Sequence, residues 1–201
     1  MEPSRKNDNP AVPRASAEAD PFDLGRTLRL SGVLNWEAAE ALVTNLETLA
    51  TASNDPIRLV IASPGGLVAC GLAVLDTINR IAIPVTTEVM GCAYSAGALV
   101  AQAGTRRLIA PNGLIRLHEV TEDCNGMVVL SQMQRMVEEN VARQGRLESI
   151  IAKKTGQPRR VIHSWCINEH PFGAEEALKM RLVDAIIGPV SRLENPLTQP
   201  K

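Results

Sequence analysis

The chain has 201 residues, of which 45% are hydrophobic and 21% charged, so it can form one globular domain with a substantial core. Its net charge of -1 and aromatic content of 2% give no reason to expect a nucleic acid or an anionic membrane surface as partner. The four cysteines form no C-x-x-C pair and the three histidines lack metal-ligand spacing. We therefore expect reduced thiols in a cytoplasmic protein, and no metal site.

The two ends of the chain differ in composition from the middle. Residues 1–23 are polar, contain four prolines and lack an apolar signal-peptide core, so they predict a flexible N-terminal arm. Residues 189–201 predict a flexible C-terminal tail of similar character. No apolar stretch reaches the length of about 18 residues that a membrane span needs, so we expect none. One domain is expected over residues 24–188.

Short apolar runs alternate with amphipathic segments in the first half of the domain. Leu28–Leu30 predicts a short strand, and Asn35 is expected to cap a helix that ends before Pro56. Further strands are predicted at Ile57–Ala62, Val85–Met90, Arg107–Ile109 and Leu114–Leu117, and helices at Leu67–Ile81 and Ser95–Ala103. Strands joined by crossover helices are typical of an α/β domain with a mainly parallel sheet.

The second half begins with a different pattern. Met127–Lys154 predicts one long helix, with Gly145 as a candidate kink. This helix is longer than a compact core of this size needs, and its methionines suit either an adaptable interface or core packing. Pro158 is expected in the first turn of the next helix. A short helix from Ala174 and a terminal strand at Val183–Ile187 complete the predicted domain.

Three positions follow the carboxyl ends of predicted strands and favour one chemistry. Ser95 lies at a strand-to-helix turn among small residues, Gly66 ends a Ser-Pro-Gly-Gly turn, and His118 closes a further apolar run. The carboxyl ends of parallel strands meet at one edge, so these residues can converge. A serine nucleophile, a histidine base and the amides of Gly66 and Ala96 as an oxyanion hole would then perform acyl transfer.

Each of these residues also has a purely structural interpretation. A serine among alanines and glycines is usually a helix cap or a packing residue, and a lone histidine is as often a hydrogen-bonded core residue as a base. A Ser-Pro-Gly-Gly segment is often only a tight turn. The joint order of glycine turn, serine and histidine is what favours a hydrolase.

In this order the motifs resemble those of the proteolytic subunit of the Clp protease (ClpP family). The resemblance covers about Leu24 to Ile187. It is carried by Ser63–Gly66, Met90–Ala98, Pro111-Asn112 followed by His118, Thr155–Gln157, Ala174–Ala177 and Leu182–Asp184. The resemblance implies a ClpP/crotonase-like α/β fold, with a βαβ superhelical core and a protruding "handle" helix in the region of about 119–157.

The resemblance also implies roles for individual residues. Ser95 would be the nucleophile, His118 the general base, and Glu169, at the family's aspartate position, the acid that orients the histidine. A solvated loop carboxylate is the alternative interpretation of Glu169. The matching positions for the oxyanion hole are Gly66 and Ala96, and those for substrate binding are Gly65, Gly66, Leu67 and Val68. An extended peptide would add along this edge as a strand.

The implied activity is that of a serine endopeptidase cleaving unfolded proteins or short peptides inside an oligomeric chamber. The chamber would consist of two stacked seven-subunit rings, a tetradecamer, and would need no cofactor or metal. Besides further copies of the chain, a ClpP paralogue and an AAA+ unfoldase are candidate partners, and the unfoldase alone would use ATP.

Departures from the family pattern keep two alternatives open. An acidic segment, Glu119–Gly126, stands where the family has Gln-Pro and a glycine-rich strand, and Asn168 replaces an arginine that helps to link rings. The first alternative is a catalytically weakened or structural ring subunit. The second is a crotonase-type acyl-CoA enzyme, against which the serine–histidine pairing argues.

Overall fold

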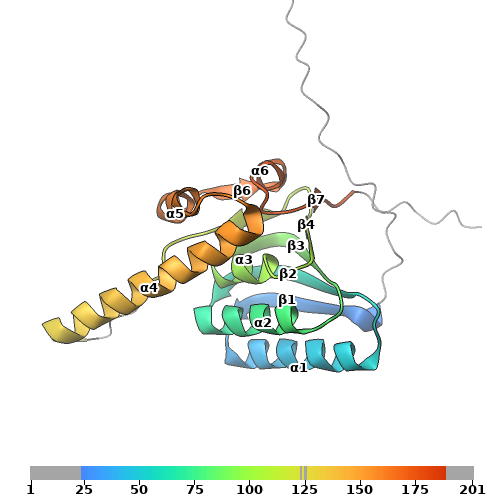
Figure 1. The fold of residues 1–201 in the computed structure, drawn as a ribbon, viewed down its shortest axis with the longest axis horizontal. Coiled ribbons are helices and arrows are strands. Elements are labelled where there is room, and N and C mark those ends of the chain that lie inside the picture. Colours follow the sequence, from blue (N-terminus) through green and yellow to red (C-terminus); the bar gives the residue numbers. More distant parts are fainter. Residues whose placement is uncertain (1–23, 123, 125, 189–201) are drawn as a thin grey trace, which may run out of the picture.

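The computed structural model describes residues 24–122, 124 and 126–188 (Figure 1). The arm predicted at 1–23 and the tail predicted at 189–201 lie outside these residues. The described part begins with a short 3-10 helix, η1 (Leu24–Arg26). None of the helices in the described ranges is both long and apolar enough to cross a membrane.

Seven strands of the described residues form one mainly parallel sheet. Its main path runs β1 (Thr27–Leu34), β2 (Ile57–Gly66), β3 (Val85–Tyr94), β4 (Arg106–Ile109) and β7 (Ala185–Ile186). β5 (Leu114–Arg116) pairs in parallel with the end of β3, and antiparallel with β6 (Pro171–Gly173). The mixed α/β class expected from the sequence is confirmed.

The helices connect these strands and extend beyond them. They are α1 (Trp36–Ala52), α2 (Val68–Arg80), α3 (Ala96–Ala101), α4 (Leu130–Thr155), α5 (Arg159–Asn168) and α6 (Ala174–Lys179). α1 packs on β1 and on α2, and α2 packs on α3. Figure 1 shows α4 as a single long helix that extends away from the sheet, as the resemblance implied.

Local sequence accounts for where the first elements begin. Asn35 caps α1, because its side-chain oxygen accepts a hydrogen bond from Ala38 N at 2.9 Å. In β2, successive residues from Leu59 to Ile61 are all buried, as expected for a strand whose two faces are both covered.

Several element boundaries differ from the prediction. β2 continues through Gly66, and β3 continues through Tyr94. The apolar pattern ends earlier in both strands, but the glycines and other residues that follow it still pair with the neighbouring strands. Pro158 is the cap of α5 rather than a residue of its first turn, and β7 is shorter than predicted.

Gly145 also has a different role from the expected kink. α4 continues through Gly145 without interruption. A Cβ atom at this position would lie 2.6 Å from the Arg159 guanidinium, so the glycine makes room for an arginine that crosses from α5.

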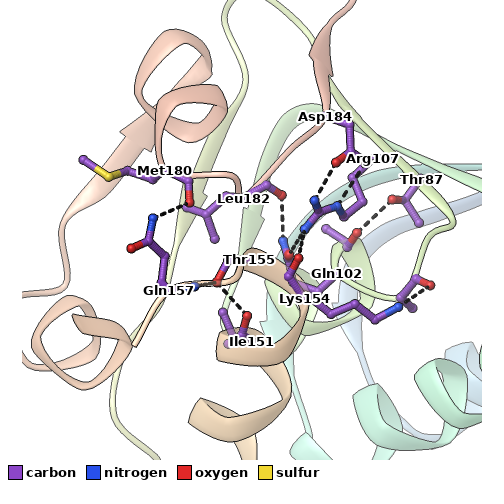
Figure 2. Close-up of polar contacts among 12 residues, drawn as sticks. Thr87, Gln102, Arg107, Ile151, Lys154, Thr155, Gln157, Met180, Leu182 and Asp184 are labelled. Atoms are coloured by element: carbon purple, nitrogen blue, oxygen red, sulfur yellow. Dashed lines mark hydrogen bonds and ion pairs between the residues drawn. The ribbon is translucent and has the colours of Figure 1, made fainter. Parts of the chain in front are cut away.

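Arg107 joins the segment that precedes β7 to the rest of the domain (Figure 2). Its Nε donates to Asp184 Oδ2 at 3.1 Å and its Nη2 to Asp184 Oδ1 at 2.5 Å. Nη1 donates to Gln102 Oε1 at 2.9 Å and to the Lys154 carbonyl at 3.2 Å. The fully buried Gln102 in turn donates to the Leu182 carbonyl at 2.9 Å. One arginine thus joins α3, α4 and the segment that enters β7.

Candidate active site

The register of β3 and β5 brings Ser95 and His118 to the same edge of the sheet. Tyr94, the last residue of β3, pairs with Arg116, the last residue of β5. Ser95 follows β3 directly, His118 follows β5 by two residues, and Ser95 N donates to the Arg116 carbonyl at 3.0 Å. The convergence expected from the strand order is therefore present.

The backbone of Ser95 is strained and sits directly against a glycine. Ser95 has φ 53° and ψ -124° and forms the N-cap of α3, a conformation costing about 1–3 kcal/mol for a non-glycine residue. A Cβ atom on Gly65 would lie 2.6 Å from Ser95 Cβ and 2.7 Å from the Tyr94 carbonyl oxygen. Only a glycine at position 65 allows this approach without a shift of the serine.

The turn around Gly66 is equally constrained. A Cβ on Gly66 would lie 2.2 Å from the Leu34 carbonyl oxygen, and Gly66 has φ 152°. The fully buried Ser63 donates its hydroxyl to the Gly32 carbonyl at 2.6 Å and accepts from Gly65 N at 3.1 Å. These contacts hold the Gly65–Gly66 backbone in a single arrangement beside Ser95.

A cavity of about 430 Å³ lies at this edge of the sheet. Of the predicted site residues, those that line it are Ser95, His118, Gly66, Leu67, Val68 and Ala96. Gly65 does not line the cavity and packs behind Ser95. The strand edge predicted for substrate binding ends at Gly66, because Val68 opens α2 and Leu67 N already donates to the Leu34 carbonyl at 2.9 Å.

One side-chain hydrogen bond fixes the tautomer of the half-buried His118. Nδ1 lies 2.5 Å from the Glu119 carbonyl oxygen. A carbonyl can only accept, so Nδ1 carries the proton and Nε2 is left as the basic nitrogen of the neutral ring. Among the described residues, no hydrogen bond joins Ser95 to His118. Catalytic hydrogen bonds often tighten only when a substrate is bound.

Glu169 is not brought to this cavity. It caps the C-terminus of α5 with left-handed φ of 49°, its side chain is exposed, and it does not line the cavity. Within the described part of the chain, no hydrogen bond or ion pair joins Glu169 to His118. The left-handed turn from α5 into β6 leaves this carboxylate on the surface.

A different carboxylate, which the sequence did not single out, lines the cavity. Glu148 on α4 is only 2% exposed. It accepts hydrogen bonds from Arg159 Nε at 2.9 Å and Gln144 Nε2 at 3.1 Å, and it lies 2.6 Å from His163 Nδ1. Burial would raise the pKa of the Glu148 carboxyl, but the hydrogen bonds from His163, Arg159 and Gln144 outweigh it and lower this pKa. Glu148 is therefore an ionised, buried carboxylate.

Gln144 connects this carboxylate to the segment that follows His118. Its Oε1 accepts from Val120 N at 2.8 Å. The available sequence signal was spacing: Gln144 and Glu148 lie four residues apart, on the same face as the apolar Leu147 and Ile151. A charged residue on the apolar face of a helix indicates a buried polar network.

The polar groups of the cavity suit acyl transfer. They include a serine hydroxyl, an imidazole with a free basic nitrogen, and backbone amides at a glycine turn and at the start of α3. Across the described residues, no group of three or more His, Cys, Asp or Glu side chains could hold a metal ion. A strained serine between a strand and a helix, which lines the same cavity as a histidine, defines a candidate serine-hydrolase site on an α/β fold.

Comparison with known proteins identifies the family. The sequence profile described as Clp protease matches residues 19–190. Proteins named ATP-dependent Clp protease proteolytic subunit from Streptococcus thermophilus and Streptococcus salivarius are 31% identical to this chain over 165 residues, and that from Streptococcus pyogenes is 32% identical. Each alignment covers 81% of this chain and 84% of the relative. The chain belongs to the Clp protease family.

Proposed function

We propose that this protein is a serine endopeptidase in which Ser95 is the nucleophile and His118 the general base. The observation that carries the proposal is that Ser95, whose backbone is strained, lines one cavity together with His118 and Gly66. The name shared by the relatives, proteolytic subunit of an ATP-dependent Clp protease, supports peptides as the substrate class.

The proposed reaction proceeds by two acyl transfers. His118 Nε2 takes the proton of Ser95 Oγ as this oxygen attacks the peptide carbonyl, and the oxyanion accepts hydrogen bonds from the amides of Gly66 and Ala96. The imidazolium then protonates the leaving amine, and the first peptide fragment departs. Water, deprotonated by the same nitrogen, hydrolyses the acyl-enzyme, releasing the second fragment and restoring the serine.

The walls of the cavity suit an extended peptide. Leu67, Val68 and Leu99 provide an apolar side. The opposite rim is charged and consists of Glu119, Glu122 and Arg143, of which Arg143 pairs with Glu122 at 3.7 Å. In the proposed complex the peptide backbone lies against Gly66, and its carbonyl enters the oxyanion hole.

The proposal includes assembly into a chamber. Seven copies would form a ring and two rings would stack, so that only short or unfolded chains reach the sites. Exposed apolar residues along α4 support this, since such a surface on a long protruding helix suits burial against another subunit. A paralogue or an AAA+ unfoldase would complete the assembly in the cytoplasm, with no cofactor needed by the peptidase.

The position of Glu169 favours one second candidate, a weakly active or structural ring subunit. A carboxylate on the surface, without a described contact to His118, would not orient the base in this conformation. Such a subunit would assemble into rings but react slowly or not at all with active-site reagents.

The experiment that tests the proposal is labelling with a fluorophosphonate, followed by mass spectrometric mapping of the modified residue. We expect the assembled protein to be labelled at Ser95, and the Ser95→Ala and His118→Ala variants to remain unlabelled. His170→Ala is the matched control, because His170 is an exposed histidine that pairs with Glu176 at 2.8 Å. Intact rings without label at Ser95 would contradict the peptidase and support the structural subunit.

A further inference from the structure

We propose that Glu148 is the acid that positions His118, and that it acts through Gln144 and the peptide unit between Glu119 and Val120. This inference rests on the proposed peptidase function and names the positioning residues of the same site. Neither Gln144 nor Glu148 would touch the reacting atoms, so both are positioning residues.

The first two contacts involve a single peptide unit. His118 Nδ1 donates to the carbonyl oxygen of Glu119 at 2.5 Å. The amide of the same peptide unit, Val120 N, donates to Gln144 Oε1 at 2.8 Å. The peptide unit thus accepts on the side of the histidine and donates on the side of α4.

The third contact ends the series of hydrogen bonds at the charged carboxylate of Glu148. Gln144 Nε2 donates to Glu148 Oε1 at 3.1 Å. Every donor in the series therefore points from His118 toward the carboxylate, and the peptide and amide groups are polarised in the same sense. Aligned hydrogen bonds of this kind strengthen one another.

The far end of the series is held rigidly. Glu148 is 2% exposed, and Arg159 Nε donates to its second oxygen at 2.9 Å. Gly145 provides the space in which the arginine reaches this carboxylate, since a Cβ there would lie 2.6 Å from the guanidinium. The carboxylate is thus fixed in place, and its Oε1 accepts both from His163 Nδ1, at 2.6 Å, and from Gln144 Nε2.

This arrangement would influence both the orientation and the charge of the base. Fixing the Glu119 carbonyl keeps the proton on Nδ1 and presents Nε2 to the serine hydroxyl. When Nε2 takes up a proton, the positive charge is stabilised by the polarised series that ends on Glu148. The effect is weaker than that of a carboxylate in direct contact, because two neutral groups intervene.

A merely structural role, in which Glu148 ties α4 to α5 through Arg159 and His163, makes a different prediction. It would affect stability and assembly but not specifically the reaction step. The labelling reaction separates the two, because its reagent-binding constant and its maximal rate can be measured independently on assembled protein.

We expect Glu148→Gln and Gln144→Met to lower the maximal rate of Ser95 phosphonylation by about tenfold and to change the binding constant by less than about twofold. Glu169→Gln, the matched control at the exposed carboxylate, is expected to react within about twofold of the wild type. Fast reaction of both α4 variants, with slow reaction of Glu169→Gln, would overturn the inference while leaving the peptidase proposal intact.

A double exchange provides the rescue. In Gln144→Glu/Glu148→Gln the new carboxylate at position 144 can accept from Val120 N and from the new amide at position 148, so the series from His118 still ends on a carboxylate and only the bond between positions 144 and 148 is reversed. We expect this double variant to react at least about fivefold faster than Glu148→Gln alone. A double variant no faster than the single one would overturn the inference.

A final measurement does not depend on labelling. In nitrogen-15 spectra of the histidine side chains, with His118→Ala used for assignment, we expect Nδ1 of His118 to be the protonated nitrogen. Its proton resonance should move upfield in Glu148→Gln and stay in place in Glu169→Gln. An unchanged resonance in Glu148→Gln would refute the inference, even if the wild-type protein proved inert toward the phosphonate.

Discussion

Gly65 and Ser95 pack so closely that a single methyl group would not fit between them. A Cβ on Gly65 would lie 2.6 Å from Ser95 Cβ, and Gly65 also has a φ of 103°, which favours glycine. Gly65 therefore packs directly behind the candidate nucleophile, Ser95, and does not itself line the cavity.

We expect Gly65→Ala to reduce labelling of Ser95 at least about a hundredfold, because the added methyl would push the strained serine out of position. Gly32→Ala is the matched control: Gly32 also has a positive φ, 79°, but a Cβ atom added there would meet nothing within 4 Å. Both variants carry the backbone penalty, and only Gly65→Ala carries the clash. Similar labelling rates in the two variants would show that the close contact does not matter.

Much of the fold could be predicted because its signal is local. Apolar runs and amphipathic periods mark the strands and helices in order, and Asn35 begins α1 as a cap. The ends of β2 and β3 could not be predicted in the same way. Glycine and other small side chains give no periodic pattern, although their backbones stay in the sheet through Gly66 and Tyr94.

The candidate site shows the same division. The convergence of Ser95 and His118 follows from parallel strand order, which the sequence reveals. The roles of Gln144 and Glu148 depend on where α4 packs. Their spacing on an apolar helix face indicates a buried polar pair, but it does not say which groups the pair contacts. The position of Glu169 depends on a left-handed turn after α5, which no residue type at that point specifies.

The exposed apolar residues of α4 predict a surface that another subunit covers. Val129, which is the N-cap of α4, and then Met133, Val137 and Val141 recur every four residues and are between 48% and 67% exposed. We expect Val137→Lys to weaken ring stacking, because a lysine would be desolvated in the interface. Native mass spectrometry should then show a shift from fourteen-subunit toward seven-subunit species, numbers that come from the proposed assembly. Ser131→Lys, exposed and off this stripe, should leave the assembly unchanged.

The ion pair between Arg107 and Asp184 predicts a loss of stability in acid. Burial would raise the pKa of the Asp184 carboxyl, but the hydrogen bonds and charge of Arg107 outweigh it and lower this pKa. A carboxyl with a lowered folded-state pKa stabilises the fold above its unfolded value of about 4, and this contribution is lost as the pH falls through the folded-state value.

We therefore expect Asp184→Asn to lower the free energy of unfolding by about 1–2 kcal/mol at pH 7, a modest figure because the carboxylate is partly exposed. The difference from wild type should shrink as the pH falls below about 4. Urea titrations at one fixed protein concentration measure both quantities. Asp76→Asn, at an exposed carboxylate on α2, should show neither effect. A difference that stayed constant with pH would contradict the assignment.

The cavity thiol of Cys166 provides a chemical test of how closely α4 and α5 pack. Burial raises the pKa of Cys166 to about 11, although the neighbouring Gln144 side chain acts in the opposite direction. At pH 8 only about one thiol in a thousand would then be the reactive thiolate. We expect iodoacetamide to modify the exposed Cys124 at least about tenfold faster than Cys166, as measured by peptide mass spectrometry. In urea the two rates should become similar. Equal rates in the folded protein would show that the packing of α5 does not bury the Cys166 thiol.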